Sequence, residues 1–134
     1  MSDEAFKDML IELNSWLITD PKIIELFNQG CVKSFNRPDY IDETQTSIVY
    51  IPVGTPQQSS NGSNQSLNKQ FIYQINVESI DRLETKTLQR TIELILQEHG
   101  FKQIIGGLDE YFQETKRYVD ARRYKIFSPL YENY

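Results

Sequence analysis

The sequence contains little of the chemistry on which most enzymes depend. One cysteine, Cys31, and one histidine, His99, occur among 134 residues. A single cysteine cannot form a disulfide within the chain, and one cysteine with one histidine cannot complete a usual zinc site. The glycine-rich motifs that hold nucleotide phosphates, G-x-G-x-x-G and G-x-x-x-x-G-K-[S/T], are also missing. These absences predict a protein without a metal, a cofactor or a nucleotide site.

The residues that remain for catalysis are few. His99 ends a predicted helix, where an imidazole interacts with the partial negative charge of the helix terminus. Cys31 follows another predicted helix end, and packing is the usual role of a small buried cysteine. The acidic residues form two groups, neither with the spacing of a calcium loop or a paired carboxylate. The groups are Asp39, Asp42 and Glu43, and Asp109, Glu110 and Glu114. We therefore predict that the protein is not an enzyme.

Long apolar runs are absent as well. No window approaches the roughly 18–20 apolar residues that a membrane-spanning helix needs, and the N-terminus lacks the basic start and apolar core of a signal peptide. The net charge of −5 argues against general nucleic-acid binding, which is typical of basic domains. We expect a cytoplasmic protein without membrane contact. A mean hydropathy of −0.52 indicates a lean core, which suggests an extended loop or a partner.

The strongest pattern that is present lies between Gln70 and His99. Apolar side chains alternate at positions 71, 73, 75 and 77, which is typical of a strand with one buried face. After Asp81 the apolar spacing changes to that of a helix over 83–99, with Gln89 on its polar side. The apolar positions are Leu83, Leu88, Ile92, Ile95 and Leu96. Asp81-x-x-Glu84 resembles a capping box, and Gly100 is a typical helix end.

The remaining patterns complete the fold prediction. Helices are expected over 1–17 and from Pro21 to Gly30, with Asp20 as the cap of the second helix. Strands are expected at 31–35, 46–53 and 101–105, the last ended by Gly106-Gly107, and a closing antiparallel strand at 115–127. We predict one α+β domain over 1–127, followed by a tail at 128–134. Its sheet is mixed, mostly antiparallel, and packed by the N-terminal helices and the helix at 83–99.

Residues 54–69 form the most polar segment. Leu67 is its one large apolar residue in sixteen positions. Such a segment cannot bury enough surface to offset its ordering entropy, so we predict a mobile tip of a β-hairpin. A long loop is either functional or a tolerated insertion. As a functional loop, its candidate protein-contact residues are Gln57, Gln58, Asn61, Asn64, Gln65 and Lys69.

The closing strand holds the one concentration of positive charge. Five of the fourteen cations fall within ten residues: Lys116, Arg117, Arg122, Arg123 and Lys125. With Tyr118 and Tyr124 between them, they form a candidate contact for an acidic protein surface or a phosphate backbone, and the net charge favours protein. Alternation places Arg123 and Lys125 on one face and Arg122 on the other. The alternative is a solvated strand face.

Taken together, these segments resemble the small tail-terminator proteins of long-tailed phages and prophages of Gram-positive bacteria. The likeness covers about residues 1–127. It lies in the helix Asp8-Met-Leu-Ile-Glu-Leu-Asn-Ser-Trp-Leu17, the helix started by Asp20-Pro21, the hairpin with a polar tip, the unit at 70–99, Gly100-Phe101, and the stretch from Asp109-Glu-Tyr-Phe-Gln-Glu-Thr-Lys-Arg-Tyr118 to Arg122-Arg-Tyr124. Head–tail connector and tail-completion proteins are similar and remain an alternative.

The resemblance implies a structural role without catalytic residues. Such proteins assemble as rings, commonly of six subunits, that cap the tail tube, stop its polymerisation and provide the surface for head attachment. The implied partners are other copies of the chain, the tail tube protein and the head-side connector proteins, with DNA at most passing through the ring. The implied location is the host cytoplasm during assembly and then the virion. A non-viral adaptor domain that binds protein through residues 116–125 is a further alternative.

Overall fold

The computed structural model describes residues 6–37, 44–62, 65–129 and 133–134. They form one six-stranded sheet with three helices packed against it, so the predicted single α+β domain is confirmed. The elements are α1 (Met9–Leu17), α2 (Pro21–Asn28), β1 (Val32–Ser34), β2 (Ser47–Pro52), β3 (Gln57–Gly62), β4 (Gln65–Ser79), α3 (Arg82–Glu98), β5 (Lys102–Phe112) and β6 (Arg117–Phe127).

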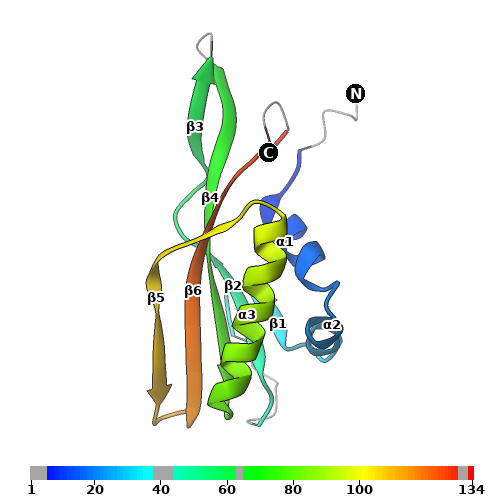
Figure 1. The fold of residues 1–134 in the computed structure, drawn as a ribbon, viewed down its shortest axis with the longest axis vertical. Helices are drawn as coiled ribbons and strands as arrows, with labels where there is room; N and C mark the ends of the chain where they lie inside the picture. Colours follow the sequence, from blue (N-terminus) through cyan, green and yellow to red (C-terminus); the bar gives the residue numbers. More distant parts are fainter. Residues whose placement is uncertain (1–5, 38–43, 63–64, 130–132) are drawn as a thin grey trace.

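The sheet is mixed and mostly antiparallel, as predicted. Its strand order is β1-β2-β4-β6-β5, and β3 pairs with the first part of β4. Only β1 and β2 run parallel among the described pairs, with Val32 opposite Ile48. The helices lie on one face, α3 along β4 and β6 and the two N-terminal helices beside it (Figure 1). The core between helices and sheet includes Leu13, Leu17, Ile48, Tyr50, Ile75, Val77, Ile92 and Leu96.

The first helix is shorter than predicted. It begins at Met9 because Asp8 Oδ1 accepts a hydrogen bond from the backbone N–H of Leu10 at 2.9 Å and so caps the helix. Residues 1–5 of the predicted helix lie outside the described residues, and Phe6 precedes the helix and is exposed. The second helix begins as predicted, since Asp20 accepts from the backbone of Lys22 and Ile23.

The third helix was predicted in position but not in its buried face. Asp81 caps it and Gly100 follows it at a φ of +94°. Leu83, assigned to the apolar side, is 66% exposed, whereas Gln89, assigned to the polar side, is fully buried. The buried stripe is Thr85, Leu88, Gln89, Ile92 and Leu96. It is rotated relative to the predicted stripe because Gln89 makes its hydrogen bonds inside the protein.

The strand after α3 does not end at Gly106-Gly107, as the sequence suggested, but continues to Phe112. The two glycines lie in a bulge, where the register against β6 shifts between Ile104 and Gly107. A Cβ atom on Gly107 would lie 1.9 Å from the carbonyl oxygen of Ala121, so only glycine fits there. The Gly-Gly pair bends the strand instead of ending it.

The polar segment at 54–69 is largely a β-hairpin. Gln57 pairs with Gln70 and Gly62 with Gln65, so the predicted hairpin continues as β3 and the first part of β4 through most of the segment for which we predicted a mobile tip. This hairpin projects beyond the helices and the rest of the sheet (Figure 1). Near the C-terminus, Asn133 lies against the segment before α1, because the backbone N–H of Lys7 donates to its carbonyl oxygen at 2.6 Å.

Candidate assembly surfaces

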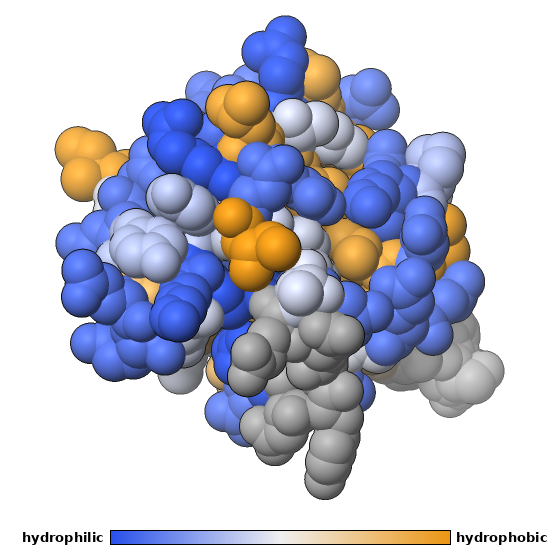
Figure 2. Space-filling view, turned by 90° about the horizontal axis from the view of Figure 1, so that it is seen from below, coloured by the Kyte–Doolittle hydropathy of each residue, from blue (hydrophilic) through white to orange (hydrophobic). Residues whose placement is uncertain are grey.

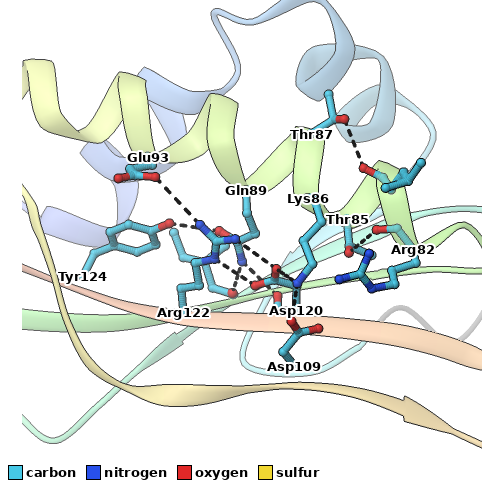
Figure 3. Close-up of polar contacts among 12 residues, drawn as sticks. Arg82, Thr85, Lys86, Thr87, Gln89, Glu93, Asp109, Asp120, Arg122 and Tyr124 are labelled. Atoms are coloured by element: carbon cyan, nitrogen blue, oxygen red, sulfur yellow. Dashed lines mark hydrogen bonds and ion pairs between the residues drawn. The ribbon is translucent and has the colours of Figure 1, made fainter.

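A buried glutamine joins α3 to two strands of the sheet. The Nε2 atom of Gln89 donates to the carbonyl oxygens of Ile75 at 2.8 Å and Asp120 at 2.9 Å, and its Oε1 atom accepts from the hydroxyl of Tyr124 at 3.0 Å (Figure 3). Both amide protons and the amide oxygen are therefore paired inside the core. A fully paired polar group adds geometric specificity to a core, so Gln89 fixes α3 over β4 and β6.

A second contact between α3 and the sheet is ionic. Lys86 bonds to Asp109 on β5 and, at 2.8 Å, to Asp120 on β6. The buried carboxylate of Asp120 also accepts from Nε of Arg122 at 3.0 Å, and Arg122 lies 3.8 Å from Glu93 of α3. These charges lie together between the helix and the two strands (Figure 3). The network therefore ties the outermost strand, β5, to the centre of the fold.

The pKa shifts of Lys86 and Asp109 favour their charged forms, and that of Tyr124 favours its neutral form. Burial lowers the pKa of Lys86, but its hydrogen bonds to Asp109 and Asp120 outweigh burial and leave that pKa above its ordinary value. The hydrogen bond from Lys86 holds the pKa of Asp109 below its ordinary value. Burial raises the pKa of the Tyr124 phenol. A general acid or base for neutral pH needs a pKa near 7, and these shifts run away from it. The network is suited to positioning strands.

Lys116 and Arg117, the first two cations of the predicted basic strand, do not form one surface. Arg117 is 1% exposed, and its guanidinium donates to the carbonyl oxygens of Gln45 and Glu78. Desolvation lowers its pKa. Lys116 precedes it in the turn between β5 and β6, at a φ of +56°. Arg117 therefore packs the start of β6 against its neighbours instead of facing a partner.

Alternation along β6 separates the other three cations as predicted. Arg122 faces α3, whereas Arg123 and Lys125 lie on the opposite face of the sheet. Nε of Arg123 donates to Oε1 of Gln74 at 3.0 Å, and the ammonium of Lys125 lies 5.4 Å from the ring centre of Phe127. Both side chains are half-buried. Arg123 and Lys125 are the members of the set that a partner could reach on this face.

The candidate contact residues of the hairpin lie at its base and near its tip. Gln57 and Gln58 are exposed, and the ammonium of Lys69 donates to the backbone oxygen of Tyr134 at 2.7 Å. Asn61 and Gln65 lie in the paired strands, whereas Asn64 lies outside the described residues. The hairpin is thus a projecting, strongly polar arm that is anchored at Lys69.

The edge strand β5 is the surface that sequence reasoning missed. It forms the end of the strand order, so one row of its backbone N–H and C=O groups faces outward. Three of its apolar side chains are exposed: Ile105 at 98%, Leu108 at 37% and Tyr111 at 47%. The sequence signal for this surface is Ile104-Ile105-Gly106-Gly107, because glycine inside a strand pattern marks a bulge as well as an end. Elsewhere, in the view from below, apolar side chains are scattered among polar ones (Figure 2).

The described residues that were considered for catalysis lie in the core, at a helix end and on the surface. Cys31 is buried, with its sulfur 3.5 Å from Oε1 of Gln45, and burial raises the pKa of the thiol. His99 caps α3 and stacks on Trp16, with ring centres 4.1 Å apart and an angle of 10°. Glu110 and Glu114 are exposed on and after β5. The group Asp39, Asp42 and Glu43 lies outside the described residues.

Comparison with known proteins assigns no family: no protein-family model matches the chain, and no curated protein matches it. Across the described part of the chain, no three His, Cys, Asp or Glu side chains are grouped to hold a metal ion. None of the helices in that part is both long and apolar enough to cross a membrane. The surfaces described above and the sequence resemblance therefore carry the functional proposal.

Proposed function

We propose that this protein is a structural component of a phage tail, a tail terminator that caps the tail tube as a ring of identical subunits. The cap ends tube polymerisation and provides the surface to which the head attaches. The observation that carries the proposal is the long exposed edge of β5, which supports assembly in a chain whose sequence resembles tail terminators. An unpaired edge is a ready template for pairing with another chain.

The fold supports separate surfaces for self-assembly and for partners. A closed ring needs a heterologous interface, in which one patch of a subunit meets a different patch of the next. The edge strand β5 and the edge strand β1 lie at opposite ends of the strand order, so they offer two different patches for a heterologous contact. The hairpin of β3 and β4 projects away from both. We assign it the contact with the tube protein or the head-side connector.

The test is to add the protein to purified tail-tube protein during polymerisation and to measure tube length. The matched variant replaces residues 59–68 by Asn-Gly. Because Gln58 and Lys69 already pair, the two-residue turn closes the shortened hairpin without changing the register. We expect short, uniform tubes with the wild type and uncontrolled growth with the variant, although both remain folded. Normal tube growth with the wild type would refute the terminator role and favour a connector that docks elsewhere.

The adaptor alternative has its own variant. Lys125 lies on the face away from the helices, so reversing it to Glu alters that face without breaking the pair between Arg122 and Asp120 or the packing of Arg123 beside Gly106. A terminator is expected to keep its control of tube length in this variant. Loss of binding to a protein partner with tube length unaffected would instead support the adaptor.

A further inference from the structure

We infer that Ile105 on the edge strand of one subunit inserts into an apolar hollow beside β1 of a second copy of this chain. The inference deepens the proposed function and rests on it, because a ring requires a head-to-tail contact. What it adds is the pair of sites that forms this contact.

Ile105 is held outward by the bulge in β5. Its side chain is 98% exposed, the highest exposure among the large hydrophobic residues that the structure describes. The bulge needs glycine at two positions. Gly106 has a φ of +129°, which residues with a side chain rarely adopt, and a Cβ atom on Gly107 would lie 1.9 Å from the carbonyl oxygen of Ala121. Bulges at sheet edges commonly redirect a side chain. Here the redirected side chain is apolar and lacks a cover within the subunit.

The hollow lies at the other margin of the same sheet, between α1, α2 and β1. Its volume is about 320 Å³. It is lined by Leu10, Ile11, Asn14, Phe27, Val32, Lys33, Ser34 and Tyr50. Ile11 and Phe27, at 67% and 40% exposure, stand on its rim with apolar surface open to water. A branched aliphatic side chain fits within this space and suits the apolar side chains that line it.

The strand order makes the two sites complementary between subunits. β5 and β1 end the sheet on opposite sides, so the protruding side chain of one copy and the hollow of the next can meet while the hollow of the first stays open (Figure 1). A protruding apolar group with a hollow elsewhere on the same molecule produces a heterologous contact, which closes into a ring or continues as a filament.

The charges around the two sites are also complementary. Within the described lining of the hollow the charged residue is Lys33, which is exposed. On β5, Asp109 is already paired with Lys86, whereas the exposed Glu110, which follows the bulge, carries the negative charge that complements Lys33. Opposite charges at the rim guide encounter and select register. Both halves of the match are on this chain, and a second copy is therefore the occupant that we assign.

The test replaces Ile105 by Lys, which removes the apolar anchor and places a positive charge against Lys33. Leu94→Lys is the control, because Leu94 is 49% exposed on α3 and lies in neither site. Sedimentation of the full chain, alone and with purified tube protein, measures self-association. We expect Ile105→Lys to weaken it by roughly thirtyfold or more, the loss typical of a central anchor, and the control to leave it unchanged. Far-UV circular dichroism checks that the fold of both variants is retained.

A mixing experiment tests the head-to-tail arrangement. Ile11→Lys damages the hollow while leaving Ile105 intact. Each variant alone should stay monomeric, but an equimolar mixture should form dimers and no larger species, because one intact interface per pair remains. The inference would be overturned if the mixture formed no dimers, or if Ile105→Lys alone associated as strongly as the wild type. A wild type that associates and limits tube length while Ile105→Lys also associates refutes only this interface. A wild type that neither associates nor limits tubes refutes the proposed function itself.

Discussion

The bulge in β5 gives the sharpest prediction about the fold. Gly107→Ala adds one Cβ atom that would lie 1.9 Å from the carbonyl oxygen and 2.7 Å from the carbonyl carbon of Ala121. The residue also has a φ of +94°, which costs a residue with a side chain about 1–2 kcal/mol. Relief of the overlap requires movement of backbone and costs about 1–3 kcal/mol more. We therefore expect the free energy of unfolding to fall by about 2–5 kcal/mol.

Gly100→Ala is the matched control for this prediction. Gly100 has the same φ of +94°, but its nearest atom to an added Cβ is Cδ1 of Ile126 at 4.0 Å, an ordinary contact. This variant should lose only the conformational part, about 1–2 kcal/mol. Urea unfolding followed by tryptophan fluorescence of Trp16 measures both losses. With an m-value of about 2 kcal/mol per molar, the two midpoints should differ by about 0.5–1.5 M. Equal losses would show that β5 and β6 are not packed as closely at Gly107 as described.

Three further predictions concern the contacts of α3. Gln89→Leu should lower the free energy of unfolding by about 2–3 kcal/mol, because it leaves the Tyr124 hydroxyl buried without its acceptor. The double variant with Tyr124→Phe should regain part of this stability, as measured by urea unfolding. Asp109→Asn should cost about 0.5 kcal/mol at pH 7, since the carboxylate is 59% exposed. The lowered pKa of Asp109 means that its stabilisation is fully present above about pH 4 and is lost as pH falls through the folded-state pKa. The difference in stability between wild type and variant should therefore shrink as the pH falls below about 4. Leu96→Ala should cost about 2–5 kcal/mol by thermal or urea unfolding because Leu96 is fully buried, and a smaller loss would contradict the core described.

Local patterns predicted most of the elements but not the contacts between them. Alternation at 71–77 predicted the second half of β4, although that strand begins earlier, at Gln65, and the caps Asp20 and Asp81 predicted the correct helix starts, since each signal depends on neighbours in the sequence. Gln89 was assigned to the wrong side of α3 because polarity alone argues for exposure. Its acceptors, the carbonyl oxygens of Ile75 and Asp120, come together only in the folded sheet.

The candidate contact surfaces, too, were only partly predictable from local sequence patterns. The polar segment at 57–62 has low strand propensity, and it becomes β3 through pairing with β4, a case in which context overrides propensity. The alternation of Arg122 and Arg123 was predictable from strand geometry. The burial of Arg117 was not, because its acceptors on Gln45 and Glu78 are distant in sequence. The proposed contact between Ile105 and the hollow beside β1 depends on strand order, which the sequence alone does not specify.

The proposed capping of a tail tube is tested most directly by imaging tube ends. Tubes assembled with a gold-labelled form of this protein would be examined by electron microscopy, with the label attached at Leu94, away from the hairpin and both edges. The proposal predicts a cluster of label at one end of each tube and none along its length. Label scattered along the tubes, or absent from their ends at saturating protein, would contradict it.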